Sequence, residues 1–110
     1  MNPNEIYKSF IEAGNAWAEA QYEFQQLDDQ SKSMLAALTL EAKATEGVGS
    51  MAEAKEIALA AQGYRDHLRD VAKAKLVASK ARVKYDAMHA LFDAQRSVEA
   101  TNRAALKAAP

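Results

Sequence analysis

The chain of 110 residues carries 15 acidic and 14 basic side chains, a net charge of −1, and no cysteine. This length fits one domain, the near-neutral charge gives no bulk attraction to nucleic acid or membrane, and the lack of cysteine excludes disulfides and thiolate chemistry. Helix-forming residues dominate, prolines occur only at positions 3 and 110, and no alternating β-branched run is present. The sequence therefore predicts an all-α fold. It has no signal-peptide pattern and no apolar run of about 20 residues, which favours a cytoplasmic protein that does not enter a membrane.

A first helix is predicted over residues 3–45. Asn2 is a suitable N-cap, Pro3 suits the first helical position, and Glu5 favours the positive end of the helix. Residues at steps of four and three form the seam expected of a helix that packs against another helix. The seam consists of Ile6, Phe10, Ala13, Trp17, Ala20, Phe24, Leu27, Ser31, Met34 and Leu38. Only Ser31 interrupts its apolar character, and so long a helix needs a partner to cover the seam.

A turn is predicted at residues 46–50, because Gly47 suits the position just after a helix end. Ser50 followed by Glu53 matches a capping box, in which a hydroxyl and a carboxylate satisfy free backbone N–H groups. A short middle helix is therefore expected over residues 51–62.

The third helix is predicted over residues 64–107, after a kink or brief break at Gly63. Its best seam consists of Tyr64, Leu68, Val71, Ala74, Ala78, Ala81, Tyr85, Met88 and Phe92. Folding this helix back on the first would place large side chains against small ones. The expected pairs are Leu38 with Leu68, Phe24 with Ala81, and Trp17 with Met88. The predicted fold is thus a long antiparallel helical hairpin, similar to a coiled coil, in a single domain over residues 1–110.

The distribution of charge favours the same pairing. Residues 4–30 carry six acidic side chains and one lysine, whereas residues 64–84 carry seven basic side chains and two acidic ones. Each exposed ion pair contributes only about 0–1 kcal/mol. The pattern therefore selects the antiparallel orientation more than it stabilises the fold.

Each long helix also carries a second apolar line on another face. A two-helix hairpin needs one apolar stripe per helix, so a second stripe indicates a further partner. We predict a homodimer in which two hairpins form a dimeric helical bundle. The expected oligomer or partner interface consists of Tyr7, Ile11, Ala18, Tyr22, Leu76, Val83 and Ala90. The alternative is that the middle helix and a slightly rotated core cover these side chains, with scattered exposure for the others.

Two groups of ionisable residues resemble metal or catalytic sites, namely Asp86, His89 and Asp93, and Asp66, His67 and Asp70. A metal site in a helical bundle needs matching ligands on the facing helix, where only Glu12 and Glu19 are expected. The serine, histidine and aspartate residues lie on regular helices, and no glycine-rich loop follows a strand. The sequence therefore predicts no catalytic residue, no metal site and no cofactor.

A basic arc occupies about a quarter of the circumference of the third helix, at the usual 100° per residue. It consists of Arg65, Arg69, Lys73, Lys80 and Lys84. Such a line of cations could contact a phosphate backbone. No aromatic residue lies in the arc to stack on bases, so the alternative is a solvated face partly neutralised by the first helix.

Four segments resemble small uncharacterised proteins encoded by bacteriophages and prophages: SMAEA at 50–54, QGYR at 62–65, NAW at 15–17 and RVKYDA at 82–87. This resemblance implies a phage accessory protein that acts in the bacterial cytoplasm and whose gene lies near phage replication or recombination genes. It identifies no functional residue in this sequence. The expected function is that of a non-enzymatic adaptor acting through protein–protein contacts. The alternative is a nucleic-acid-associated accessory factor that uses the basic arc.

Overall fold

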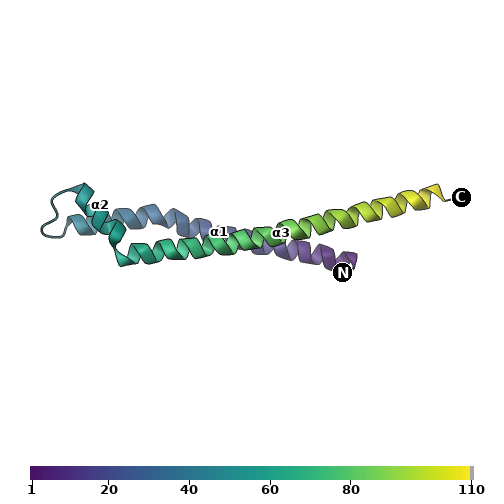
Figure 1. Cartoon of the computed structure of the whole chain (residues 1–110), viewed down its shortest axis with the longest axis horizontal. Helices are drawn as coiled ribbons and strands as arrows, with labels where there is room; N and C mark the ends of the chain where they lie inside the picture. Colours follow the sequence, from purple (N-terminus) through teal and green to yellow (C-terminus); the bar gives the residue numbers. More distant parts are fainter. Residues whose placement is uncertain (110) are drawn as a thin grey trace. The chain divides into compact units, whose positions relative to one another are not determined.

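Three helices make up nearly all of the computed structural model, which describes residues 1–109 (Figure 1). They are α1 (Pro3–Lys43), α2 (Met51–Ala60) and α3 (Gln62–Ala108). No strand occurs among the described residues. The prediction of an all-α helical hairpin with a short middle helix is confirmed. Pro110, the last residue of the predicted domain, lies outside the described residues.

Capping bonds define where two of the helices begin. At the start of α1, the backbone N–H of Glu5 donates to Asn2 Oδ1 (2.9 Å), and the N–H of Asn2 donates to Glu5 Oε2 (3.2 Å). At the start of α2, the N–H of Glu53 donates to Ser50 Oγ (3.1 Å), and the N–H of Gly49 donates to Glu53 Oε2 (3.1 Å). Side-chain oxygens thus satisfy N–H groups that have no partner within the helix.

The chain turns between α1 and α2 at Gly47. The N–H of Val48 donates to the carbonyl oxygen of Thr45 (3.3 Å), and Gly47, the third residue of this turn, has a φ of 90°. A turn with positive φ at its third residue favours glycine, which lacks the Cβ that would clash. α1 ends at Lys43, two residues before the predicted end.

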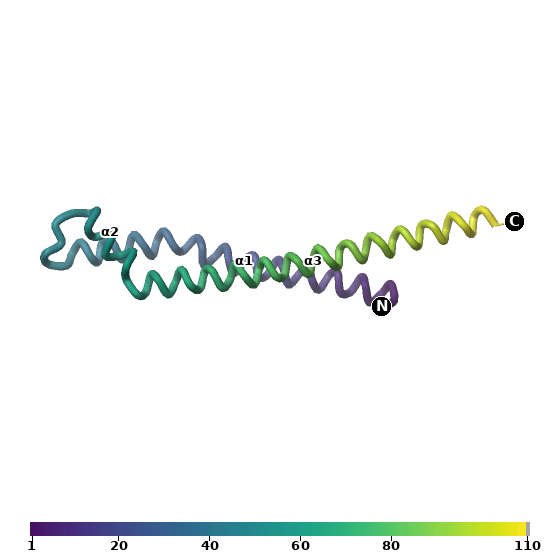
Figure 2. The backbone as a smooth tube through the Cα atoms, in the orientation of Figure 1, coloured from purple at the N-terminus to yellow at the C-terminus, as the bar shows by residue number. Residues whose placement is uncertain are grey.

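A single non-helical residue, Ala61, separates α2 from α3, and the backbone turns sharply there (Figure 2). Ala61 is extended, with φ −61° and ψ 136°. Its N–H still donates to the carbonyl oxygen of Ala58 (3.1 Å), and its own carbonyl oxygen accepts from the N–H of Arg65 (3.0 Å). The break therefore leaves these backbone groups paired. It lies two residues before Gly63, which belongs to the first turn of α3.

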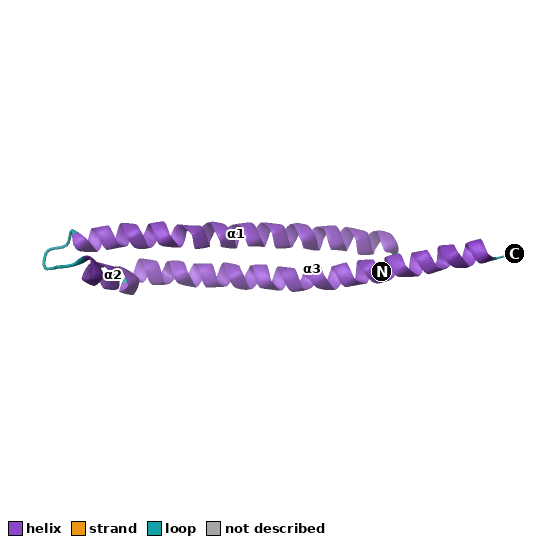
Figure 3. Cartoon of the chain, turned by 90° about the horizontal axis from the view of Figure 1, so that it is seen from above, coloured by secondary structure: helices purple, strands orange, loops and turns teal. Residues whose placement is uncertain are grey.

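The helices form two compact units. The terminal unit combines Met1–Glu19 with Ala78–Pro110, and the elbow unit consists of Ala20–Val77. In each unit, a part of α1 runs antiparallel to a part of α3 (Figures 1 and 3). The elbow unit also contains α2.

Aromatic side chains fill the core of the terminal unit. The ring of Tyr85 lies 5.3 Å from that of Phe10 and 5.1 Å from that of Trp17, and Phe10 lies 4.9 Å from Phe92. Ile6, Ala13 and Ala78 are buried beside them. The side chain of Tyr85 also approaches Gly14, where an added Cβ would lie 3.4 Å from the ring. Residues 96–109 are exposed at every position, and α3 continues past the start of α1 (Figure 3).

In the elbow unit, α2 packs against the last turns of α1. Ala54 and Ala58 of α2 are fully buried, and Thr39 and Ala42 of α1 are buried as well. Both sides of this contact carry grooves that are lined by the two helices together. Small residues on α2 thus allow it to lie close to α1.

The seam of α3 differs from the prediction at one position. His67 is 7% exposed and belongs to the core, whereas Leu68 is 44% exposed. A strict alternation of three and four residues leads from Tyr64 through position 67 to Val71, so the spacing favours His67 although the apolar character favours Leu68. The other predicted seam positions on both long helices are buried or half-buried.

The register of the two helices is also corrected. Trp17 lies against Tyr85, three residues before the predicted Met88. Ser31 contacts His67, one heptad before Ala74, which the predicted pairing of Phe24 with Ala81 would place opposite it. Leu38, which was expected to face Leu68, lines a groove with Ala58 and Ala61. The physical reason is that α2 occupies the place opposite the end of α1, so α3 begins opposite an earlier part of α1. Phe24 and Ala81, the third predicted pair, are both half-buried and belong to different units.

The expected attraction between acidic and basic helices produces no direct ion pair between them. The three ion pairs between Lys or Arg and acidic side chains among residues 1–109, and the contact of His89 with Asp93, all join side chains of one helix at a spacing of three or four residues. The charged side chains of both long helices are solvent-exposed. They therefore remain available to other molecules.

Candidate functional site

A polar pair of the buried His67 and the half-buried Ser31 lies in the core of the elbow unit. Ser31 Oγ is 2.9 Å from His67 Nε2 and 3.4 Å from the carbonyl oxygen of Leu27. If Nε2 carries the proton, His67 donates to the serine oxygen while the serine hydroxyl donates to Leu27, and each of these polar atoms is used. The only polar position of the α1 seam thus meets the polar position of the α3 seam. The predicted seam contains Leu68 in place of His67, although the three-four spacing favours His67.

Ser31 and His67 are as close as a nucleophile and its general base in an active site, but their surroundings do not suit catalysis. A catalytic serine needs access to substrate and donors for the developing negative charge. His67 is almost fully buried, and Ser31 lies within the continuous helix α1, where backbone N–H groups bond to the preceding turn. A buried polar contact in a helical seam instead fixes the register of the two helices.

Within each of the two groups of ionisable residues singled out from the sequence, the three side chains do not converge on one point. His89 Nε2 lies 3.5 Å from Asp93, whereas Asp86 pairs with Arg82 at 4.0 Å. Asp66 accepts from Gln62 Nε2 (2.7 Å), while the neighbouring His67 points into the core. Within residues 1–109, no three histidine or acidic side chains are grouped so that they could hold a metal ion.

The predicted interface residues are exposed and fall on separate faces. In the terminal unit, Ile11 and Ala18 directly follow the core positions Phe10 and Trp17, so they flank the core on one side of α1. Val83 and Ala90 lie midway between core positions of α3 and face away from α1. Tyr7 joins the first face, and its ring lies 6.1 Å from that of Phe92. Tyr22 and Leu76 are exposed in the elbow unit.

All residues of the basic arc are exposed on α3. Arg65, Arg69 and Lys73 belong to the elbow unit, and Lys80 and Lys84 belong to the terminal unit. Arg69 pairs with Asp66 at 3.6 Å, and the other four cations make no ion pair with any of residues 1–109. Their positive charges are therefore not neutralised by direct contacts.

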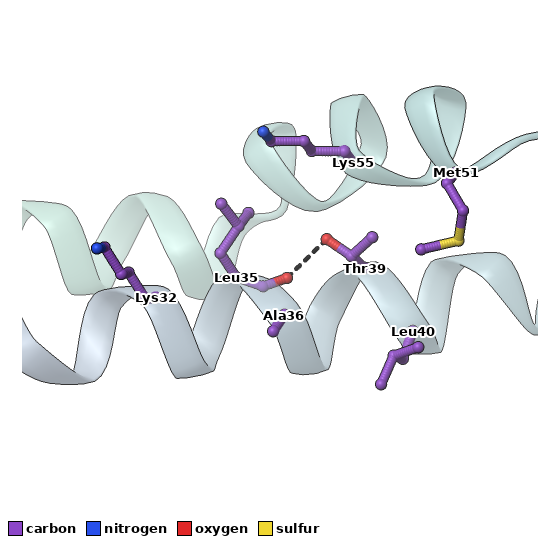
Figure 4. Close-up of a pocket in the computed structure, with 7 residues that line it drawn as sticks. All are labelled: Lys32, Leu35, Ala36, Thr39, Leu40, Met51 and Lys55. Atoms are coloured by element: carbon purple, nitrogen blue, oxygen red, sulfur yellow. Dashed lines mark hydrogen bonds between the residues drawn. The ribbon is translucent and has the colours of Figure 1, made fainter.

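An apolar groove of about 420 Å³ lies in the elbow unit between α1 and α2 (Figure 4). It is lined by Lys32, Leu35, Ala36, Thr39, Leu40, Met51 and Lys55. Leu35 and Thr39 point toward α2, and Met51 points back toward α1 (Figure 4). The sequence did not indicate this groove, because it depends on how α2 packs against α1.

Comparisons with protein-family models, curated proteins and solved structures find no match to this chain. Among residues 1–109, no helix is both long and apolar enough to cross a bilayer.

Proposed function

We propose that this protein is a non-enzymatic interaction protein that forms a homodimer and binds a second protein. The observation that carries the proposal is a stripe on the exposed flank of α1 in the terminal unit. This α1 stripe consists of the exposed residues Tyr7, Ile11 and Ala18 together with Gly14, which is half-buried beside the ring of Tyr85. Tyr7 is 56% and Ile11 is 46% exposed, although both are large apolar side chains on a well-packed unit.

The α1 stripe is complementary to itself. Its members are four, three and four residues apart, so the spacing reads the same in both directions. In an antiparallel contact between two copies of α1, Tyr7 would lie opposite Ala18 of the second copy, and Ile11 opposite Gly14. Large side chains then meet small ones, as close packing requires. Such an isologous contact gives a closed two-fold dimer, the commonest symmetric assembly.

The outer face of α3 suits a different partner. Val83 is 69% exposed and has Lys80 and Lys84 within one helical turn. Two copies of this face would bring lysines of like charge together, which disfavours self-association. We assign Val83 and Ala90 to contacts with the second protein. The resemblance to phage-encoded proteins favours a phage accessory role in the bacterial cytoplasm.

A nucleic-acid-associated role is the second candidate, because four cations of the basic arc have no ion pair among residues 1–109. Phosphate contacts by such side chains would be strongly salt-dependent. A shift assay with single- and double-stranded DNA at low salt tests this role. Binding that weakens when Lys80 and Lys84 are replaced by glutamate would support it, and no binding at low salt would exclude it.

Light scattering coupled to gel filtration tests the dimer. The chain has a mass of 12.0 kDa, so a dimer has about twice that mass. Ile11→Asp places a charge in the centre of the α1 stripe and should return the protein to a monomer. Val83→Asp is the matched control, since it makes the same kind of change at an exposed apolar position on another face. Circular dichroism establishes that both variants remain helical.

Two results would contradict the dimer proposal. One is a wild-type mass of 12.0 kDa at micromolar concentration. The other is a dimer that survives Ile11→Asp, which would show that the α1 stripe does not form the interface.

A further inference from the structure

The groove between α1 and α2 has an apolar floor and a cationic end. Leu35, Ala36, Leu40 and Met51 supply most of its lining. The Thr39 hydroxyl donates to the carbonyl oxygen of Leu35 (2.7 Å), so this polar group is already paired. Lys32 and the extended side chain of Lys55 lie toward one end of the groove, and Met51 lies toward the other (Figure 4).

The two lysines of this groove form no direct ion pair among residues 1–109. No acidic side chain lines the groove. Asp28, one turn before Lys32, is not paired with it. Leu40 is 65% exposed and Met51 is 52% exposed at the apolar end. An occupant should therefore offer apolar side chains together with negative charge at one end.

The dimensions of the groove favour a helix as the occupant. Its lining on α1 extends from Lys32 to Leu40, which is about 12 Å, or roughly two helical turns, at 1.5 Å per residue. Two turns of an amphipathic helix present apolar side chains about three and four residues apart on one face, as in other helix-in-groove complexes. Methionine in the lining adapts to such side chains.

We propose that this groove is a docking site for an acidic amphipathic helix of a partner protein. The apolar residues of that helix contact Leu35, Leu40 and Met51, and its carboxylates contact Lys32 and Lys55. The exposed end of α3 in a second copy is a poor occupant, because Arg103 and Lys107 would bring further positive charge to the lysines. This site lies in the elbow unit and goes beyond the homodimer, which uses the α1 stripe.

Fluorescence anisotropy with a designed peptide tests the proposal. The probe is a labelled helical peptide of about 15 residues, with leucines at three- and four-residue spacing and glutamates beside them. Its control carries lysines in place of the glutamates. We expect the glutamate peptide to bind, the lysine peptide not to bind, and the affinity to fall as salt rises.

Three variants of the full chain locate the binding. One exposed ion pair supplies up to about fivefold in affinity. Reversing both charges in Lys32→Glu/Lys55→Glu removes two such pairs and adds repulsion, and should therefore weaken binding by roughly tenfold. Leu40→Asp should weaken it at the apolar end. Lys75→Glu, at an exposed lysine of the same unit outside the groove, should leave it unchanged.

Several results would overturn the proposal. They are equal binding of the two peptides, failure of both to bind, or equal weakening by Lys75→Glu and by the groove variants. Dodecanoate is a second probe, and its binding in the groove without binding of the glutamate peptide would assign the site to a fatty carboxylate instead. Light scattering separates this proposal from the dimer, because the groove variants should keep the dimeric mass whereas Ile11→Asp should keep peptide binding.

Discussion

Replacement of Ser31 by alanine removes the hydroxyl that pairs with His67 in the core of the elbow unit. His67 Nε2 lies 2.9 Å from this hydroxyl, and the residue is only 7% exposed. A buried polar atom left without a partner costs about 1–3 kcal/mol. Alanine returns roughly 0.5 kcal/mol through its higher helix propensity. We therefore expect Ser31→Ala to lower the free energy of unfolding by about 0.5–2.5 kcal/mol.

Ser33→Ala is the matched control for this change. Ser33 lies two residues further along the same helix, and its side chain is exposed. The substitution gains the same helix propensity without breaking the buried contact, so it should stabilise the protein by roughly 0.5 kcal/mol. Urea unfolding followed by circular dichroism, at one fixed protein concentration, measures both variants. Equal effects of the two substitutions would show that the Ser31–His67 bond does not contribute to stability.

Two further predictions concern the turns and caps around α2. Gly63→Ala should raise the free energy of unfolding by up to about 1 kcal/mol, because the position is helical and nothing lies within 4 Å of an added Cβ. Gly47→Ala should lower the free energy of unfolding by about 1–2 kcal/mol, because the φ of 90° at this position is unfavourable for a residue with a Cβ. The thermal unfolding temperatures of the two variants should therefore shift in opposite directions. Ser50→Ala removes the acceptor of the Glu53 N–H and should cost about 1 kcal/mol, which urea unfolding measures. A shift below 0.3 kcal/mol or so would mean that α2 does not depend on this cap.

The local features of the fold were predictable because they depend on residues close in the sequence. The caps at Asn2 and Ser50 and the turn at Gly47 follow from local side-chain and backbone chemistry. The α1 seam follows from its three-four spacing, and none of its ten members is exposed.

The register could not be predicted from periodicity. A heptad pattern repeats every seven residues, so a shift of one heptad leaves every apolar position in the seam. What excludes the shifted register is the Ser31–His67 contact together with the packing of α2 against the end of α1. Both are tertiary features. Ranking Leu68 above His67 by hydrophobicity removed the one polar residue that could have aligned the helices.

Some features of the candidate sites were likewise predictable from the sequence, whereas others depend on tertiary packing. Exposure of the second apolar line was expected from its position outside the seam, and the side chains of Tyr7, Ile11 and Val83 are exposed. The self-complementary spacing of the α1 stripe is present in the sequence, but it includes Gly14, which the predicted second apolar line does not contain. The groove between α1 and α2 requires the position of α2, which periodicity does not give.

Disulfide trapping across the α1 stripe tests the antiparallel homodimer most directly. The chain contains no cysteine, so introduced thiols report only on their own positions. A mixture of Tyr7→Cys and Ala18→Cys copies should form the mixed disulfide dimer in preference to either symmetric one, because these positions lie opposite each other in the proposed contact. Symmetric dimers in equal or greater yield, or no covalent dimer at all, would contradict the proposed contact.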